Sequence, residues 1–339
     1  MAAAVSVLIV THNSAAWIAA CLASIPAGLD GRRHEVVVCD NASTDGTSEL
    51  VARLAPRARV VRQANLGYGA GVNRAAREAT GELLVVLNPD TVAESGSLAR
   101  LADAAVAKTI AIPTITLLAD PERVNTCGLD LHFTGLATVR GLGDPADDWA
   151  RQDSPGGFSG AAFAMRRHDF QALGGFDDAF FLYLEDVDLA WRARRNGFAF
   201  VHVGDARVRH DYRFQPGARK LGLAEEGRLI LLRRHFAWWH WLAYAPSLLA
   251  VEVLAWGQAV RFGPKGLAAK GRAVRRGWRR LPPRPATGRL AMSAWATRRV
   301  RFANLGAGPV LRALLAPLNA LFWLNTLAWR RRPKAAGRA

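Results

Sequence analysis

The 339-residue chain has only three cysteines, at positions 21, 39 and 127. They form no CxxC pair and no metal-binding spacing, which argues against a disulfide framework or a cysteine metal site. Cys21 and Cys39 lie in apolar runs, so we expect buried thiols in a reducing compartment. The N-terminus also lacks a basic segment before its short apolar run, so we interpret it as a first strand rather than a signal peptide. The sequence therefore predicts a cytoplasmic protein.

Acidic residues are scarce in the last third of the chain. Residues 216–339 contain three Asp and Glu against 24 Lys and Arg, a net charge of +21. Residues 1–215 contain 25 Asp and Glu against 21 Lys and Arg, a net charge of −4. The whole chain carries a net charge of +17. Eight of the eleven tryptophans follow residue 235. We therefore predict two parts, a near-neutral domain (1–215) and a basic, Trp-rich region (216–339) suited to a nucleic acid or an anionic membrane.

Apolar, β-branched runs alternate with helical patterns in the first part, which predicts an α/β fold with an open, doubly wound sheet. After residue 110 this alternation fades, and the Gly, Asp and Pro content of 113–157 predicts loops and irregular strands. The predicted strands are 5–10, 35–40, 58–63, 82–90, 159–167, 198–203 and 206–212, and the predicted helices include 48–55 and 219–236.

Polar clusters follow three of the predicted strands. They are Thr11-His12-Asn13, Asp40-Asn41 and Asn88-Pro89-Asp90. Ligands of open α/β sheets bind beyond the carboxyl ends of the strands, so the three clusters together predict one crevice. Ordinary turns are the alternative, because Asn, Asp and Pro are common turn residues.

Two further motifs lie near this predicted crevice. The glycine loop GYGAGV (67–72) departs from the GxGxxG spacing of dinucleotide sites and does not follow the first strand. A structural role, close backbone approach at the entry to a helix, explains it at least as well. Asp90 ends a buried strand in LLVVLNPDT, where an oxygen ligand can hold Mg²⁺ or Mn²⁺.

Three carboxylates stand among apolar side chains in FFLYLEDVDLAWR (180–192). Carboxylates are costly to desolvate, so such a run needs partners or a task for them. On a helix Asp188 points about 200° away from Asp186, so both cannot face one crevice. We assign Asp188 a structural pairing with Arg192, four residues on. Taken alone, the stretch also fits a capped amphipathic helix with a solvated acidic edge.

In this order, the motifs resemble those of the family 2 glycosyltransferases. The chain is most similar to their rhamnosyltransferase-type branch, over roughly residues 4–215. The resemblance implies a GT-A fold, a nucleotide-sugar donor and transfer with inversion. The motifs are VSVLIVTHNS, VVVCDNASTDGT, NLGYGAGVNRA, LVVLNPDT, SGAAFAMRR, GGFDDAFFLYLEDVDLAWRARRNGF and ARVRHDY.

The resemblance also implies residues that bind the donor. Thr11 and Asn13 match the motif that lines the nucleotide pocket, and Asp40 matches the residue that contacts the pyrimidine base. Asn73 matches a polar position near the donor. For Asp40 and its neighbours the turn interpretation remains the alternative.

Metal and catalytic residues follow from the same resemblance. Asn88 and Asp90 match the metal motif usually written DXD, with Asn in its first position, so Asp90 is the expected direct ligand. His210 matches a late histidine that can complete the metal site, although a lone surface His is the alternative. Glu185 and Asp186 match the ED motif, in which the second carboxylate is the catalytic base and Glu185 orients the acceptor or the base.

The basic region holds two long apolar stretches, 236–258 and 309–329, separated by the Arg-rich segment 272–285. We interpret it as helices lying on an anionic cytoplasmic leaflet. Two alternatives stay open: residues 236–258 are long enough to span a bilayer, and the region could instead be a helical subdomain packed on the catalytic domain. Nucleic-acid binding is disfavoured, because the apolar runs are too long and no known module is present.

The sequence thus predicts a membrane-associated glycosyltransferase of polysaccharide or cell-envelope biosynthesis, at the cytoplasmic face of the cell membrane. With a divalent cation, Mg²⁺ or Mn²⁺, it would transfer a sugar, with dTDP-L-rhamnose as the leading donor, to a lipid-linked or glycan acceptor. UDP-galactofuranose or UDP-glucose are alternative donors. A catalytically inert, membrane-bound sugar-nucleotide sensor or scaffold is the alternative from another class.

Overall fold

The structure is a computed structural model that describes residues 4–151, 153–212, 216–279, 292, 296–302 and 309–327. It divides into two compact units. Unit 1 comprises Met1–Asp130 and Val139–Gln215, and unit 2 comprises Leu131–Thr138 and Pro216–Ala339.

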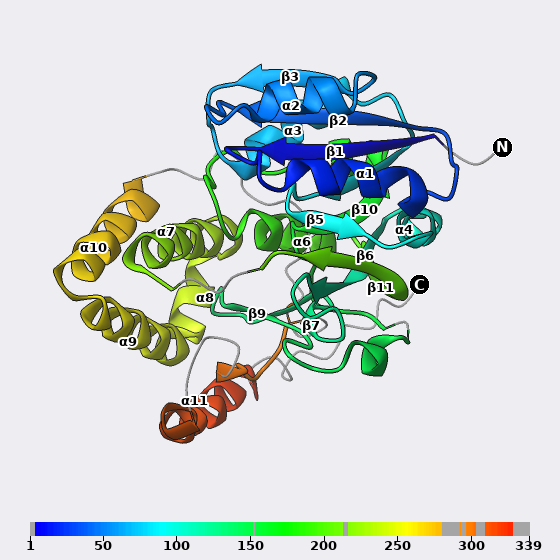
Figure 1. The fold of residues 1–339 in the computed structure, drawn as a ribbon. Coiled ribbons are helices and arrows are strands. Elements are labelled where there is room, and N and C mark those ends of the chain that lie inside the picture. Colours follow the sequence, from blue (N-terminus) through cyan, green and yellow to red (C-terminus); the bar gives the residue numbers. More distant parts are fainter. Residues whose placement is uncertain are drawn as a thin grey trace, which may run out of the picture. The chain divides into compact units, whose positions relative to one another are not determined.

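Unit 1 is built on a nine-stranded mixed sheet with the order β3-β2-β1-β4-β10-β6-β11-β5, and β7 pairs with β6 (Figure 1). The first four strands of this order run parallel, as the strand–helix alternation predicts, whereas β10 pairs antiparallel with β4, and β5 antiparallel with β11. A separate two-stranded sheet contains β8 and β9. The strands are β1 (Val5–Thr11), β2 (His34–Asn41), β3 (Arg59–Gln63), β4 (Leu83–Leu87), β5 (Thr91–Ala93), β6 (Thr109–Leu117), β7 (Val124–Thr126), β8 (Leu129–Leu131), β9 (Ala137–Val139), β10 (Ala162–Arg166) and β11 (Ala199–His210).

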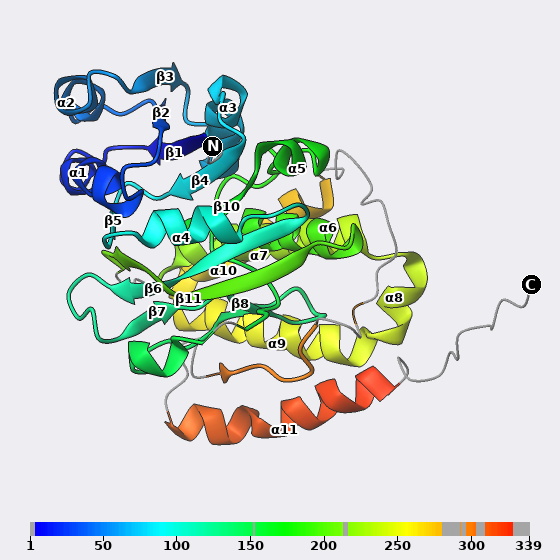
Figure 2. The same cartoon turned by 90° about the vertical axis from the view of Figure 1, so that its right-hand side faces the viewer.

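Helices cover both faces of this sheet, which is why its central strands are apolar on both sides. Every residue of β1 and β4 is buried. Figure 2 shows α1 and α2 on one face of the first strands and α3 on the other. All three cysteines are buried and free, as expected for Cys21 and Cys39. The helical elements are α1 (Ile18–Gly28), α2 (Thr47–Leu54), α3 (Tyr68–Glu78), α4 (Ser97–Ala104), the 3-10 helix η1 (Ala146–Trp149), α5 (Arg167–Ala172) and α6 (Glu185–Arg195).

The prediction of irregular structure from residue 113 is wrong at its start, because β6 continues as a buried strand to Leu117. The separate strands predicted at 198–203 and 206–212 form the single strand β11. Its register with β6 shifts between Val203 and Arg207, where β6 carries Pro113. Proline has no N–H to donate to a ladder, so the partner strand bulges there and pairing resumes beyond it.

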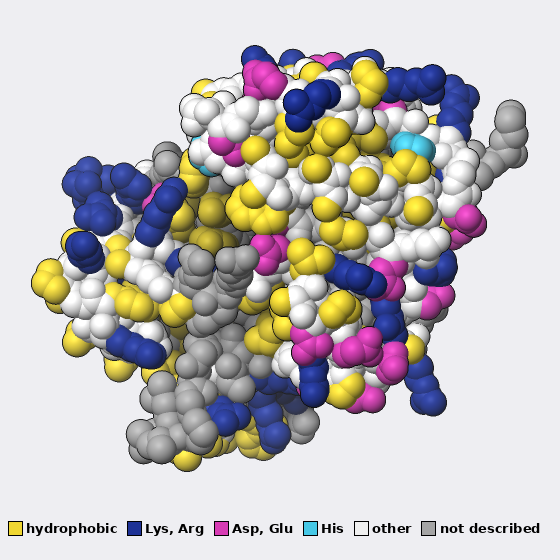
Figure 3. Space-filling model, viewed as in Figure 1, with side chains coloured by type: hydrophobic (Ala, Val, Ile, Leu, Met, Phe, Trp, Pro, Cys, Tyr) yellow, Lys and Arg dark blue, Asp and Glu magenta, His cyan; other side chains and the backbone are white. Residues whose placement is uncertain are grey.

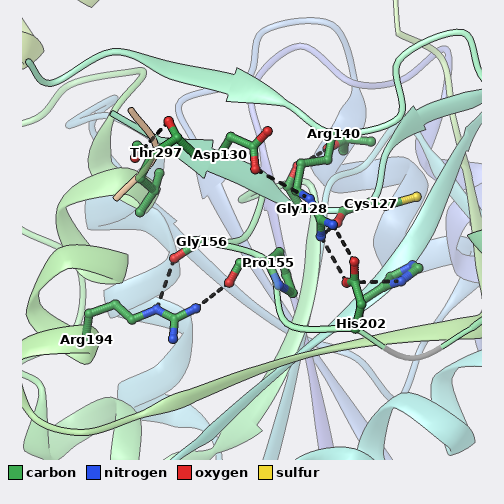
Figure 4. Close-up of polar contacts among 12 residues, drawn as sticks. Cys127, Gly128, Asp130, Arg140, Pro155, Gly156, Arg194, His202 and Thr297 are labelled. Atoms are coloured by element: carbon green, nitrogen blue, oxygen red, sulfur yellow. Dashed lines mark hydrogen bonds and ion pairs between the residues drawn. The ribbon is translucent and has the colours of Figure 1, made fainter. Parts of the chain in front are cut away.

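Arg140 ties together the loops around β7 and β8 (Figure 4). Its guanidinium donates hydrogen bonds to the carboxylate of Asp153 and to the carbonyl oxygen of Cys127. Asp130 lies 3.5 Å away. Arg194 of α6 donates in the same way to the carbonyl oxygen of Gly156, at 3.2 Å. These bonds satisfy carbonyl groups that no strand partner reaches.

Unit 2 contains helices α7 to α11. A buried charge cluster of four side chains, of which only Glu252 is partly exposed, joins three of them. Arg228 of α7 donates to Glu225 and to Glu252 of α9, while Lys270 of α10 lies 2.5 Å from Glu225 and 2.7 Å from Glu252. Lys270 is fully buried, so its charge depends on these two carboxylates. The helices are α7 (Ala218–His235), α8 (Trp238–Ala243), α9 (Ala245–Arg261), α10 (Gly263–Arg279) and α11 (Pro309–Thr326).

The alternative of a membrane span over 236–258 is wrong. The segment is divided between α8 and α9, and the chain breaks its helix at Tyr244. Among the described residues, no helix combines the length and the apolar character that crossing a membrane requires. Residues 280–285 of the Arg-rich segment and 328–329 of the second apolar stretch lie outside the described residues.

Substitution of Lys270 tests the buried charge cluster. Lys270→Met removes one of the two cations that pair with Glu225 and Glu252. Removing one member of a buried ion pair lowers the free energy of unfolding by about 3–5 kcal/mol. The exposed Lys265 lies on the same helix, and Lys265→Met is expected to change stability by less than about 0.5 kcal/mol. Denaturant unfolding followed by tryptophan fluorescence measures this, since most tryptophans lie in unit 2. Equal midpoints for the two variants would refute the role of the cluster.

Candidate active site

The nine residues implied by the resemblance all lie in unit 1. The parallel register of β1 and β2 sets Thr11 opposite Asp40 at the carboxyl ends of the two strands. Thr11 Oγ1 donates to Asp40 Oδ1 at 3.0 Å, and the hydroxyls of Ser43 and Ser48 donate to the same carboxylate. Burial opposes ionisation of Asp40, but these hydrogen bonds outweigh it and lower the pKa of the carboxyl. Asp40 is therefore a fixed, ionised group.

Asn13 lies in the loop after β1, with a left-handed backbone (φ 52°). Its side-chain oxygen accepts a hydrogen bond from the backbone N–H of Thr44 at 2.9 Å, and its own N–H donates to Ser43 Oγ at 2.9 Å. The loops after β1 and β2 are thus joined into one surface. The predicted nucleotide-binding residues Thr11, Asn13 and Asp40 all belong to this hydrogen-bonded region.

The glycine loop has a steric explanation. Gly67 has φ +103°, and a Cβ there would lie 2.2 Å from the carbonyl oxygen of Phe181. A Cβ on Gly71 would lie 2.6 Å from Val10 Cγ1. Both glycines let α3 approach its neighbours, which agrees with the structural interpretation of GYGAGV.

Asn73 of α3 has its polar atoms engaged by a nearby loop. Its Nδ2 donates to the carbonyl oxygen of Phe176 at 2.8 Å and to Asp178 Oδ1 at 3.1 Å, and its Oδ1 accepts from the N–H of Phe176. These contacts hold the chain that leads toward α6. Contact of Asn73 with a donor remains a prediction.

Asp90 and His210 are brought together by the antiparallel pairing of β5 with β11, in which His210 faces Thr91. The distance between Asp90 Oδ1 and His210 Nε2 is 3.3 Å. His210 Nδ1 lies 3.1 Å from Asn125 Oδ1, an oxygen that can only accept. This contact fixes the orientation of the ring, with Nε2 directed toward Asp90.

This pair fits a divalent cation. Asp90 Oδ1 is a buried oxygen that no donor of the described chain satisfies by a hydrogen bond. An oxygen and an imidazole nitrogen aimed at one point, with the histidine fixed by a second-shell amide, are the groups that such a cation takes. Three or more His, Cys, Asp or Glu side chains around one point are absent from the described residues. Asn88 lies two residues before Asp90, and its backbone N–H donates to the carbonyl oxygen of Ala161.

The ED pair begins helix α6. Tyr183 and Leu184, immediately before it, have positive φ angles of 69° and 67°. Residues other than glycine adopt this backbone conformation at a cost in free energy, and such strained residues cluster at functional sites. It turns the chain so that Glu185 and Asp186 occupy the first turn of the helix.

The two carboxyls have different surroundings. Asp186 Oδ2 accepts from the N–H of Gly160 at 3.0 Å and Oδ1 from the N–H of Val187 at 2.8 Å. Glu185 Oε2 is buried and accepts no hydrogen bond within the described chain. Burial, with the nearby charge of Asp186, raises the pKa of Glu185 to about 8, and burial also raises the pKa of Asp186. Two adjacent buried carboxyls do not both ionise, so the hydrogen-bonded Asp186 takes the charge and Glu185 keeps the proton at neutral pH.

Residues 159–161 link the two halves of the site. The antiparallel register of β10 with β4 brings Ala161 to Asn88, whose N–H donates to the Ala161 carbonyl at 2.8 Å. Gly160, the residue immediately before Ala161, donates its backbone N–H to Asp186. Tyr68 Oη donates to the Gly160 carbonyl at 2.5 Å. One short segment thus bridges the turn that carries Asp90 and the candidate base.

The hydroxyl of Tyr68 is affected by the carboxyl groups of the ED pair and of Asp90. Burial raises the pKa of its hydroxyl well above 10, and the charges of Glu185, Asp186 and Asp90 raise it further. Tyr68 therefore stays protonated and acts as a hydrogen-bond donor to Gly160. The hydroxyl of Tyr68 is thus within electrostatic reach of the ED pair and of Asp90.

The predicted structural role of Asp188 is confirmed. This residue is fully buried, and Arg192 Nε donates to its Oδ2 at 2.8 Å. Arg192 also donates to the carbonyl oxygen of Leu173 at 2.6 Å. The third carboxylate of the stretch thus anchors α6 instead of facing the site.

Tyr68, Asn125 and Gly160 were not predicted as site residues. The sequence signals for them are weak. Tyr68 interrupts the glycine loop, Gly160 is the second residue of the motif SGAAFAMRR, and Asn125 lies in a three-residue strand. Their roles depend on strand pairing far along the chain, which a local pattern does not reveal.

Comparisons with known proteins identify the family. The family model described as glycosyl transferase family 2 matches residues 6–174. A curated protein of Mycobacterium tuberculosis, N-acetylglucosaminyl-diphospho-decaprenol L-rhamnosyltransferase, is 31% identical over 264 residues, which cover 69% of this chain and 85% of that protein.

Two solved structures share the fold. Crystalline GalNAc-T7 with UDP, GalNAc and Mn²⁺ superposes with a TM-score of 0.56 at 16% identity, over 73% of this chain and 51% of that one. TarS 1–349 of S. aureus in complex with UDP gives a TM-score of 0.54 at 16% identity, over 99% and 94% of the two chains. Both are GT-A glycosyltransferases, so the predicted GT-A fold is confirmed.

The pH dependence of stability tests the assignment of the proton to Glu185. Its folded pKa is raised from 4.5 to about 8, so stability present below pH 4.5 is lost as the pH rises through 8. Glu185→Gln mimics the protonated acid and removes this loss. We expect the variant and the wild type to be equally stable near pH 4, and the variant to be more stable by several kcal/mol near pH 9. Parallel stability curves measured by denaturant unfolding would contradict the assignment.

Proposed function

Because the chain belongs to glycosyltransferase family 2, we propose that it transfers L-rhamnose, with inversion, from dTDP-L-rhamnose to a lipid-linked glycan acceptor. The observation that carries the catalytic part is the asymmetry of the ED pair. Asp186 accepts two backbone N–H bonds, whereas Glu185 Oε2 accepts none from the described chain. The proposal for donor and acceptor draws support from the 31% identical relative, whose name includes a rhamnosyl group and a diphospho-decaprenol acceptor.

In the proposed reaction Asp186 acts as the general base. Its carboxylate takes the proton from the acceptor hydroxyl while that oxygen forms a bond to the anomeric carbon of the donor. The bond from this carbon to the diphosphate breaks at the opposite face, so the configuration inverts. The raised pKa of Asp186 makes it a stronger base than a solvated aspartate. Glu185, protonated, is left to donate a hydrogen bond to the acceptor or the sugar.

The leaving diphosphate requires positive charge. We propose that Asp90 and His210 hold Mg²⁺ or Mn²⁺, with Asn88 beside them, and that donor phosphates complete its ligands. When bound, such a cation neutralises the negative charge that develops on the leaving group. The Mn²⁺ and UDP of the GalNAc-T7 structure support this choice. Thr11, Asn13 and Asp40 are proposed to line the nucleotide pocket, and Asn73 to lie near the donor.

We also propose a division of labour between two regions. Residues 1–215 form the catalytic domain, and residues 216–339 keep it at an anionic membrane surface on the cytoplasmic side. A lipid-linked acceptor supports this arrangement, because its reacting hydroxyl stays near the headgroups. UDP-galactofuranose and UDP-glucose remain the alternative donors.

A donor panel tests the function. Purified protein is incubated with dTDP-L-rhamnose or UDP-sugars, Mg²⁺ and a membrane lipid extract, and nucleoside diphosphate release is measured. We expect release from dTDP-L-rhamnose, and Asp186→Asn to lower kcat by about 10²–10⁴-fold. Asp205→Asn, an exposed carboxylate of the same unit, should not change it. Full turnover by folded Asp186→Asn would refute the base assignment, and release from no donor would favour a non-catalytic binding protein.

The metal site has its own test, which needs no turnover. Asn125→Ala removes the amide that orients His210, and loss of such a second-shell partner weakens metal binding by about 10–100-fold. Titration calorimetry of Mn²⁺ into protein saturated with dTDP measures the affinity. His168→Ala, at an exposed histidine, serves as the control and should leave it unchanged. Unchanged affinity in Asn125→Ala would contradict the assignment of His210 as a ligand.

A further inference from the structure

Helix α9 of unit 2 is apolar on the side that it exposes. Leu249, Val253, Trp256 and Val260 follow one another at spacings of four, three and four residues, which places them on one face. Their exposed fractions are 66%, 63%, 39% and 64%. Up to Arg261, every exposed residue of the helix is apolar or glycine. From Leu249 to Val260 this face is about 17 Å long.

The opposite face of α9 is occupied by the helix packing of unit 2. Its buried residues are Ser247, Val251, Ala255 and Ala259. Trp256 lies at the border between the two faces, with the Lys270 ammonium 5.8 Å from its ring centre. The apolar face therefore stands on a rigid base, since Lys270 belongs to the buried charge cluster. A continuous exposed apolar face is typical of a surface that binds a partner or a membrane.

Two neighbouring helices extend this surface. Helix α8, which precedes α9 directly, exposes Trp238, Trp239 and Leu242, by 75%, 49% and 69%. Helix α10 exposes a basic stripe whose members recur at helical spacing. Figure 3 shows the Lys and Arg side chains gathered over α10 and hydrophobic side chains over α9. The stripe consists of Lys265, Arg272, Arg275, Arg276 and Arg279.

The charge of this surface has one sign. The three acidic residues of 216–339 are all in ion pairs: Glu225 and Glu252 lie in the buried cluster, and Glu226 lies 3.8 Å from Arg276. A second copy of this chain would bring a like-charged surface of net +21 against its own, which disfavours self-association. An anionic bilayer offers both an apolar interior for α9 and negative headgroups for α10. Tryptophan is the residue that sits best at the boundary of the two.

We infer that α8 and α9 form the membrane-docking face, with α9 lying in the plane of the bilayer surface and its Leu249–Val260 face inserted among the lipids. The α10 stripe contacts anionic headgroups beside it. This inference specifies the surface that the proposed membrane association requires. It rests on the proposed lipid-linked acceptor for its purpose, but its test measures lipid binding without turnover.

Vesicle co-sedimentation of the full chain tests the inference. Vesicles of phosphatidylcholine mixed with phosphatidylglycerol are compared with vesicles of phosphatidylcholine alone. We expect Val253→Glu to weaken binding to the mixed vesicles at least tenfold, because it places a charge in the inserted face. Val106→Glu, at a valine of unit 1 that is 53% exposed, should leave binding unchanged. Arg272→Gln and Arg275→Gln should each weaken binding to mixed vesicles by about fivefold, and this effect should vanish at high salt.

Three results would overturn the inference. They are no binding of the wild type to either vesicle, unchanged binding of Val253→Glu, and a dimer in sedimentation velocity that Val253→Glu dissociates while vesicle binding is absent. Val253 is exposed, so its variant should fold, and circular dichroism checks this. Vesicle binding with no donor turnover would leave the inference standing and count only against the proposed reaction.

Discussion

The candidate site depends on the antiparallel pairing of β10 with β4. This pairing sets Ala161 beside Asn88, so the turn that carries Asp90 is tied to the start of β10. The adjacent Gly160 N–H then holds Asp186, which comes from a helix about a hundred residues later in the chain than Asn88. Without that strand pairing, the turn that carries Asp90 and the candidate base would have no fixed relation. Catalysis by positioning requires such a relation, because small displacements of reacting groups cost large factors in rate.

The electrostatics of the ED pair explain why two adjacent carboxyls can take different roles. Both are buried, and burial disfavours their charge. The N–H groups of Gly160 and Val187 stabilise the anion of Asp186, so one proton stays with Glu185. The same principle appears at Asp40, where three hydroxyls overcome burial and keep the carboxyl ionised. Hydrogen bonding, rather than exposure, thus decides which carboxyl of this unit carries charge.

The local patterns predicted the parallel half of the sheet, because β1, β2 and β4 are continuous apolar runs with polar ends. The pairing of Asp188 with Arg192 followed from helical spacing alone. In contrast, β6 was not predicted as a strand at all, since a proline usually argues against a central strand, and its bulged partner β11 was divided in two. Tyr68, Gly160 and Asn125 could not be predicted, because their contacts are set by strands that are distant in sequence. The break at Tyr244 lies two residues before Pro246, which has no N–H and stands in the first turn of α9, a signal that hydropathy does not carry.

The central claim is that Asp186 is a base acting on the acceptor, across from a diphosphate bound near Asp90 and His210. Such an arrangement allows a single displacement at the anomeric carbon. The most direct measurement is the anomeric configuration of the glycoside formed by the purified enzyme, read from its proton and carbon NMR spectra. The account predicts a configuration opposite to that of the donor sugar. Retention of the donor configuration would contradict it, because retention requires a different route at the anomeric carbon.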